Sequence, residues 1–176
     1  MEHCIGKQSD SIPPNNAGNT CLDILSAART LAMLGLAVVP IVPRGKRPLT
    51  KRGVHDATTD VLAIEQLFDR QPDANIGIAT GALNGLVVLD IDPDHGGEQS
   101  LRALLEQYGP LSPTLCVATG GGGRHLYFRH PGGTVRNSAG RLGAGLDIRG
   151  DGGYVVAPPS IHESGHRYRW ISGVDV

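Results

Sequence analysis

The stretch GLVVLDIDPD, residues 85–94, most constrains what this chain can fold into, because an apolar run there ends in alternating carboxylates. Successive side chains of a strand point to opposite faces, so Asp90 and Asp92 share one face while the apolar residues beside them anchor the other. Two carboxylates about 7 Å apart along a strand can bridge a divalent ion, and without a cation they repel each other. The stretch therefore predicts either a cradle for Mg²⁺ or Mn²⁺ or a solvated strand end that runs into a turn.

Length and composition favour one globular domain. The chain has 176 residues, of which 40% are hydrophobic and 19% charged, as is ordinary for a protein with a real core. Residues 1–19 are polar and rich in Pro, Asn, Ser and Gly, so we expect a loose, disordered tail there and a single domain over residues 20–172. The formal net charge of −1 excludes binding of nucleic acid by bulk positive charge, although local fields can be strong.

The cysteine and histidine spacings favour a cytoplasmic protein without structural zinc. The three cysteines form no C-x-x-C pair, so neither a disulfide framework nor a thiolate zinc site is supported. His162 and His166 have an H-x₃-H spacing, but no cysteine pair precedes them. The sequence contains no apolar run of about 18 residues and no charged-then-apolar leader, so we expect no membrane span and no secretion signal.

Basic residues gather in two parts of the chain. Residues 44–52 contain five basic residues and no acid, and from Gly120 onward seven arginines accompany four acids. This distribution fits either a polyanion partner or a solvated surface. We expect the first cluster, which includes Lys46, to touch nucleic acid or a nucleoside triphosphate.

Apolar periodicity predicts three helices. A capping box at Thr20 and Asp23 opens the first, and Gly35 ends it. The second follows the Thr-Thr-Asp cluster at residues 58–60 and ends before Pro72. The third spans residues 97–108 and ends at a Gly-Pro pair.

Short apolar runs predict the strands. Residues 36–42 and 75–81 are expected to be strands, and we expect the acidic strand to pair with the second of them as a hairpin. From Leu115 onward the pattern changes to short strands and glycine, in the segments LCVAT, HLYFR, LDIR, YVVAP and YRW. The whole pattern predicts an α+β sandwich whose second half is mostly antiparallel.

The loop from Thr119 to His125, TGGGGRH, joins two predicted strands and favours phosphate as a ligand. Its glycines, among them Gly122 and Gly123, let the backbone approach a ligand closely and aim N–H groups at it. It is not a Walker loop, because that motif needs a lysine and a following helix. An isolated histidine is more often structural, but the strand alternation lets His125 project beside a phosphate without entering the core.

Asp147 in the strand LDIR is a third acid flanked by apolar residues, and such a carboxylate requires a cation or strong donors. Arg149 points to the same face, so a salt bridge is the structural alternative to a metal. The bend Pro-Pro-Ser at residues 158–160 is expected to wall a pocket. Three acids with one phosphate-directed histidine are typical of two-metal phosphoryl or nucleotidyl transfer.

The strings LDID, GGRHLYF and LDIRGDGGYVVAPPS, with GKRP and NIGIATG ahead of them, resemble in order and spacing a known family. It is the N-terminal bifunctional DNA primase–polymerase domain of plasmid and phage replication proteins, in the archaeo-eukaryotic primase superfamily. The resemblance spans about residues 21–170. It implies an RRM-like catalytic core with a mixed or antiparallel sheet, packed with a smaller α/β unit.

The resemblance also implies roles for single residues. Asp90, Asp92 and Asp147 are implied as ligands of two Mg²⁺ or Mn²⁺ ions, and His125 is placed at the incoming triphosphate. Relatives often have a serine where Gly121 stands or near it, so Thr119 is the candidate for that hydroxyl. No zinc-binding insertion is visible, so the metal is expected to be catalytic only. The residues expected to bind the nucleotide are Thr119, Gly122, Gly123, Arg124, His125, Arg149 and Lys46.

Three functions stay open at this point. The first is a template-directed nucleotidyltransferase, a DNA primase and DNA polymerase, with a DNA template and primer and dNTP or rNTP as partners. The second is a metal-dependent nuclease or phosphohydrolase, and the third is a non-catalytic origin- or single-strand-binding module. The presence of all three acids counts against the third, as does an aromatic content of 4%, because stacking on single strands relies on aromatic faces. The phosphate-directed histidine favours the first over the second.

The resemblance raises one expectation about activity. Relatives with this catalytic unit commonly continue into a helical module and a helicase, so we expect a catalytic fragment that works with a helicase domain or subunit. Such a fragment should extend primers readily and initiate them weakly, because initiation lacks the effective concentration of a tethered primer.

Overall fold

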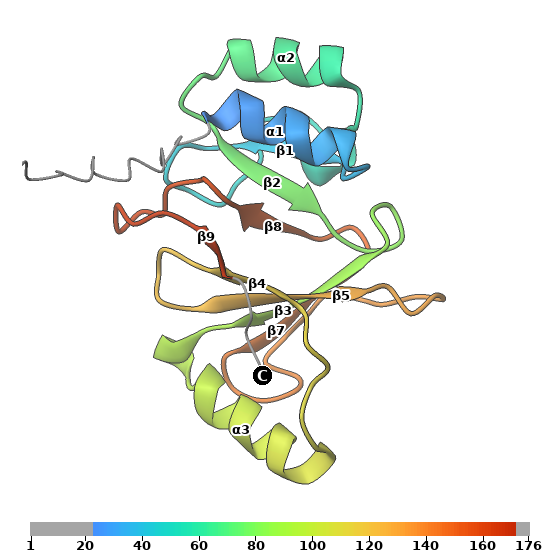
Figure 1. Cartoon of the computed structure of the whole chain (residues 1–176), viewed down its shortest axis with the longest axis vertical. Coiled ribbons are helices and arrows are strands. Elements are labelled where there is room, and N and C mark those ends of the chain that lie inside the picture. Colours follow the sequence, from blue (N-terminus) through green and yellow to red (C-terminus); the bar gives the residue numbers. More distant parts are fainter. Residues whose placement is uncertain (1–22, 172–176) are drawn as a thin grey trace, which may run out of the picture.

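Two antiparallel sheets lie face to face, with α1 and α2 on one outer side and α3 on the other (Figure 1). This arrangement comes from a computed structural model that describes residues 23–171. The α+β class and the mostly antiparallel second half are therefore confirmed. The RRM-like character of the core stays a prediction.

The smaller sheet has three strands in the order β1-β2-β8, with bounds Val38–Ile41, Asn75–Ala79 and Tyr154–Ala157. Its strands are buried almost throughout, as their unbroken apolar runs predict. The helices α1 (Ile24–Met33) and α2 (Val61–Asp69) contact each other and cover this sheet. The side chains of Asp23 and Asp60 cap their N-termini by accepting hydrogen bonds from backbone N–H groups of the first turn.

The larger sheet has six strands in the order β6-β7-β3-β5-β4-β9. The bounds in that order are Ser138–Ala139, Leu146–Arg149, Leu86–Ile91, Arg124–Arg129, Leu115–Ala118 and Arg169–Ile171. The helix α3 (Gly97–Tyr108) packs Leu101 on the face that carries Leu89, Ile91 and Leu126. The opposite face looks toward the smaller sheet and shares a core with it. Two short 3₁₀ helices, η1 (Gly53–Asp56) and η2 (Pro93–His95), complete the secondary structure of residues 23–171.

The predicted hairpin between residues 75–81 and the acidic strand is wrong. β2 and β3 belong to different sheets and meet only at the bridge between Gly81 and Leu86. The physical reason is that β2 is the central strand of the smaller sheet, so β1 and β8 already occupy both of its edges. The acidic strand instead becomes a central strand of the larger sheet, between β5 and β7.

The predicted helices are present, with one correction at the first. α1 begins at Ile24 with Asp23 as its N-cap, so Asp23 is not the third residue of a capping box. Thr20, the tail and the cysteines at positions 4 and 21 lie outside the described residues, while Cys116 is a buried free thiol. No helix in the described part of the chain is long and apolar enough to cross a membrane.

Candidate active site

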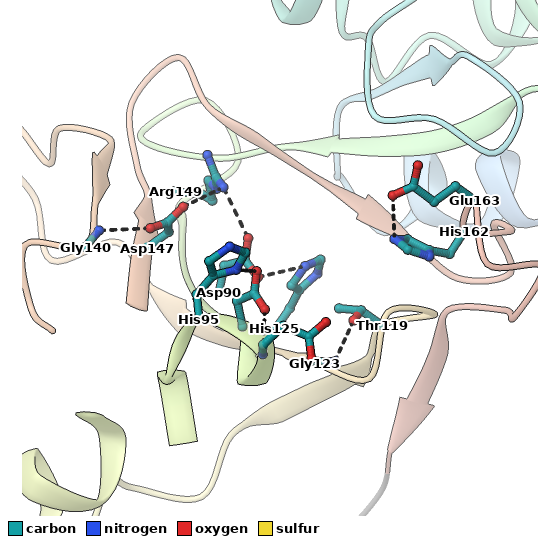
Figure 2. Close-up of polar contacts among 12 residues, drawn as sticks. Asp90, His95, Thr119, Gly123, His125, Gly140, Asp147, Arg149, His162 and Glu163 are labelled. Atoms are coloured by element: carbon teal, nitrogen blue, oxygen red, sulfur yellow. Dashed lines mark hydrogen bonds and ion pairs between the residues drawn. The ribbon is translucent and has the colours of Figure 1, made fainter. Parts of the chain in front are cut away.

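Three predicted site residues form a row across the larger sheet. Asp90 on β3 is the direct cross-strand partner of His125 on β5 and of Asp147 on β7. Directly paired residues of neighbouring strands project from the same face, so all three side chains look toward the smaller sheet. Figure 2 shows them side by side around one centre. The strand order, rather than closeness in sequence, brings Asp147 next to Asp90.

A cavity of about 710 Å³ lies over this row, between the two sheets. The row and β8 of the smaller sheet contribute to its walls, and Lys46 reaches it from the loop after β1. The predicted site residues that line it are Lys46, Asp90, Asp92, Thr119, Gly123, His125, Asp147 and Arg149. The structure therefore brings eight of the ten predicted site residues to one place.

Arg149 is the cation of this centre. Its Nη2 lies 3.2 Å from Asp90 Oδ2 and 3.0 Å from Asp147 Oδ2, so one guanidinium pairs with both carboxylates. The second oxygen of Asp147 accepts a hydrogen bond from the Gly140 N–H at 3.0 Å. The side chains of Asp90 and Asp147 are 26% and 28% exposed, so the guanidinium offsets a repulsion that is only partly screened by water.

His125 is more buried than its sequence pattern suggests. Its side chain is 7% exposed, and its Nε2 lies 3.5 Å from Asp90 Oδ1, at the limit of a hydrogen bond. Burial lowers the pKa of His125 to about 4 against the raising effect of Asp90, so the ring is neutral near pH 7. Among the described residues, His125 Nδ1 has no hydrogen-bond partner. A buried polar atom without a partner, on a residue that lines a cavity, marks a place where a ligand group can be accommodated.

Asp92 departs from the predicted alternation because β3 ends at Ile91. Asp92 is the N-cap of η2, where Oδ1 accepts from the Asp94 N–H at 3.0 Å and Oδ2 lies 2.8 Å from His95 Nδ1. Partial burial raises the pKa of Asp92, but the bonds from His95 and Asp94 outweigh it and the pKa lies below its usual value. Within residues 23–171, no three His, Cys, Asp or Glu side chains are grouped closely enough to hold a metal ion.

The glycine loop folds back tightly on itself at the edge of the cavity. The Thr119 N–H donates to the Gly123 carbonyl at 2.8 Å, and the Gly123 N–H donates to Thr119 Oγ1 at 2.9 Å. The Gly122 N–H bonds the Thr119 carbonyl at 3.2 Å, so it serves the turn. Any Cβ at Gly123 would collide with the Ile91 carbonyl, which explains why only glycine fits between the loop and β3.

Two predicted nucleotide-binding residues lie outside the cavity. Arg124 is on the opposite face of β5, where its guanidinium makes three hydrogen bonds of 2.7 to 3.2 Å with Glu98 of α3. Gly122 is exposed beside the cavity rather than in its wall. The Pro-Pro-Ser bend at residues 158–160, which was expected to form a wall of the pocket, does not line the cavity. Buried Ser160 instead accepts a hydrogen bond from the Ile76 N–H at 2.8 Å, which ties the bend to β2.

Sequence reasoning did not assign several of the residues that line the cavity, among them His95, His162, Glu163 and Tyr168. His162 was weighed only as part of a zinc spacing, and no metal group involves it among the described residues. The sequence feature that could have assigned His162 to the site was its position two residues after the Pro-Pro-Ser bend, which was expected to wall a pocket. Burial raises the pKa of Tyr168 to about 12, and the negative charge of Asp90 adds to this effect, so Tyr168 is a neutral wall of the cavity.

Comparison with known proteins gives a match to one family model and none to a curated protein. The family model matches over residues 27–176, and its description is the N-terminal domain of bifunctional DNA primase/polymerase. The matched range covers nearly the whole chain and contains the entire row and the cavity around it. The chain therefore belongs to the family of bifunctional DNA primase/polymerase N-terminal domains.

Proposed function

We propose that this domain is a template-directed nucleotidyltransferase that makes or extends primers by a two-metal mechanism. Membership of the family implies primase or polymerase activity. The observation that carries the finer proposal is the row of Asp147, Asp90 and His125, which shares one face of the sheet under a single cavity.

The paired carboxylates of Asp90 and Asp147 are the part of the donor set that is already assembled for a hard divalent cation. In the part of the chain that the structure describes, no third His, Cys, Asp or Glu side chain is grouped with them closely enough to hold the ion. Carboxylate oxygens are the ligands that Mg²⁺ and Mn²⁺ prefer, and Asp90 and Asp147 already share one positive group, the Arg149 guanidinium. Asp90, Asp147 and Asp92 are the residues that would hold the metal, with Asp92 released from His95. A metal held by these residues would activate the attacking hydroxyl and stabilise the leaving pyrophosphate.

The other residues of the cavity are suited to the nucleotide. Thr119, whose oxygen accepts from Gly123, still has a hydroxyl proton to donate to a phosphate. Lys46 adds a positive charge from the side of the smaller sheet, and His125 adds an imidazole with one nitrogen that lacks a partner in the described residues. Arg149, which pairs with Asp90 and Asp147, would be free to pair with phosphate oxygens if a metal held those two carboxylates. A plasmid or phage replication setting, an RRM-like core and a helicase partner remain parts of this proposal.

A primer-extension assay tests the proposal. The protein is given a labelled primer on a DNA template with dNTP or rNTP, in Mg²⁺, in Mn²⁺ and in EDTA, and the products are separated on a gel. We expect extension that needs the metal, and a loss of at least about a hundredfold in Asp90→Asn, because several kcal/mol of charge stabilisation are removed. Asp69→Asn, at an exposed position on α2, is the matched control and should keep full activity.

Other results would assign a different function. Metal-dependent shortening of the primer without extension would indicate a nuclease. Binding of single-stranded DNA without any change of the primer would indicate a non-catalytic module. Incorporation by Asp90→Asn within tenfold of the unsubstituted protein would contradict the two-metal mechanism.

A further inference from the structure

The hairpin formed by residues 161–167 places a further imidazole, that of His162, in the active cavity. We propose that His162 is a second phosphate-binding residue, whose Nε2–H donates to the triphosphate of the incoming nucleotide. This inference rests on the proposed function, because it deepens the description of the same site. It assigns to the hairpin a role in binding, whereas the H-x₃-H spacing had suggested only a zinc site.

The hairpin is fastened to the glycine loop. The His162 N–H donates to the His166 carbonyl at 2.8 Å and closes the turn, and Ser164 Oγ donates to the Gly120 carbonyl at 2.7 Å. A Cβ at Gly120 would collide with His162, and a Cβ at Gly121 would lie 3.3 Å from its Nε2. The imidazole of His162 therefore lies directly against the part of the loop that is expected to meet phosphate.

The hydrogen bonds of His162 decide which nitrogen faces the ligand. Its Nδ1 accepts from the Ser164 N–H at 3.2 Å and is 3.1 Å from Ser164 Oγ. Because Nδ1 accepts this hydrogen bond, the ring carries a proton on Nε2. The nearest acidic oxygen to Nε2 is that of Glu163, at 3.9 Å, which is too long for a hydrogen bond, and that side chain is 80% exposed. The hydrogen bond at Nδ1 fixes the orientation of the ring, and the Nε2–H is therefore available to donate to a ligand in the cavity.

The imidazoles of His125 and His162 both lie beside one buried ring, that of Tyr168. The centroid of Tyr168 lies 6.1 Å from that of His125 and 6.1 Å from that of His162. Tyr168 is 4% exposed, so it is a rigid spacer between them. Figure 2 shows His162 and Asp147 at opposite ends of the drawn cluster, with His125 and Thr119 between them. A ligand that reaches from the carboxylates to His162 must therefore span the glycine loop.

A triphosphate fits this distribution of groups. The carboxylate end of the cavity would accept phosphate oxygens only with a metal, whereas the opposite end offers the Nε2–H of His162. His162 is 13% exposed, so a hydrogen bond from it is shielded from competing water. The chemistry that matches is a chain of phosphates whose far end accepts a hydrogen bond from this N–H.

The test compares His162→Phe, His162→Gln and His166→Phe. Phenylalanine at 162 keeps a ring against the loop and Tyr168 but removes the donor, and glutamine keeps an N–H near the position of Nε2. His166 is exposed on the same hairpin and does not line the cavity, so His166→Phe is the matched control. We measure KM and kcat for nucleotide in primer extension, the Kd of primer–template, and calorimetric binding of inorganic tripolyphosphate.

We expect His162→Phe to raise KM for nucleotide by about ten- to a hundredfold and to weaken tripolyphosphate binding similarly, with kcat and primer–template affinity little changed. His162→Gln should recover part of the loss, and His166→Phe should behave like the unsubstituted protein. An unchanged KM and unchanged tripolyphosphate binding in His162→Phe would overturn the inference, and so would equal losses in His166→Phe, which would show a purely structural hairpin.

The two proposals fail in different ways. If the unsubstituted protein extends no primer, the proposed function fails, and tripolyphosphate binding alone then decides whether His162 binds phosphate. If the unsubstituted protein extends primers, and His162→Phe has the same KM for nucleotide and the same tripolyphosphate binding, only the inference about His162 is lost.

Discussion

At the scale of single residues, Arg149 shows how this site tolerates two neighbouring carboxylates. Its guanidinium pairs with Asp90 and Asp147 at 3.2 and 3.0 Å, so the positive charge expected of a metal is supplied by the protein itself. The sequence alternation predicts that Arg149 and Asp147 share a face, but the contact with Asp90 depends on the pairing of β3 with β7. Under the proposed two-metal mechanism, a metal would compete with this guanidinium for the same carboxylates.

Arg149→Met should therefore make stability depend on metal. In EDTA the two carboxylates lose their cation, and because all three side chains are partly exposed we expect a cost of only about 1 kcal/mol, or about 2–4 °C in Tm. Mn²⁺ or Mg²⁺ should raise the Tm of the variant by more than that of the unsubstituted protein. Thermal melting with and without metal checks this, with exposed Arg129→Met as the control. Equal metal-induced shifts in all three proteins would contradict competition between Arg149 and the metal.

His125→Ala tests the other end of the row. The alanine removes an imidazole whose Nδ1 has no partner within the described residues, so we expect nucleotide binding to suffer more than stability. Loss of one hydrogen bond to a charged phosphate corresponds to about 1.5–3 kcal/mol, or roughly ten- to a hundredfold in KM. Steady-state kinetics and primer–template binding are measured together. Weakened DNA binding with unchanged KM would place His125 at the template instead.

At the scale of elements, the glycine loop matters because it meets the end of β3. Gly123 approaches the Ile91 carbonyl so closely that a Cβ would collide with it, whereas Gly132 has a φ of +89° and no atom within 4 Å of a Cβ. The first glycine is required by close packing and the second only by its backbone conformation.

This contrast predicts unequal effects of the same substitution. Gly123→Ala should cost about 1–3 kcal/mol and shift the end of β3, which carries Asp90, so incorporation should fall as well. Gly132→Ala should cost about 1–2 kcal/mol through its left-handed φ and leave incorporation unchanged. Urea melts and primer extension check both. Full activity in Gly123→Ala would show that the loop does not position the acidic strand.

At the scale of the whole molecule, the basic segment 44–52 divides between two surfaces. Lys46 lines the active cavity, while Lys51 and Arg52 line a separate hollow of about 650 Å³ beside α2. Arg52 also pairs with Asp56 at 2.7 Å and so contributes little free charge. With a net charge of −1, the molecule must bind DNA through such local patches.

A variant with glutamine at positions 46, 47 and 51 should bind DNA with a shallower salt dependence. Each lost phosphate contact lowers the slope of log K against log salt by about 0.7 on single strands and 0.9 on duplex. Fluorescence anisotropy over a range of salt concentrations measures the slope. A variant with glutamine at positions 29 and 102, on the outer helices, is the control and should keep the slope unchanged. An unaltered slope in the triple variant would make the segment an ordinary solvated surface.

The sequence alone determined the local features of this protein, because they depend on neighbours along the chain. The spacing of apolar residues and the capping residues located α2, α3 and most strands. The alternation of side chains along a strand put Asp90 and His125 on the polar side of their strands. Asp92 was the local exception, since a strand that ends one residue earlier turns its carboxylate into a helix cap.

Only the tertiary structure decided which of these local features meet. A strand presents the same hydrogen-bonding groups to any partner, so sequence pattern did not distinguish β2 from β5 and β7 as the neighbours of β3. That choice placed Asp147 beside Asp90 and let Arg149 serve both. Packing of α3 gave Arg124, which strand alternation places on the face opposite His125, a partner in Glu98. Folding of the distant hairpin onto the glycine loop brought His162 to the cavity. Such contacts arise from competition among surfaces far apart in the chain, which no short window of sequence records.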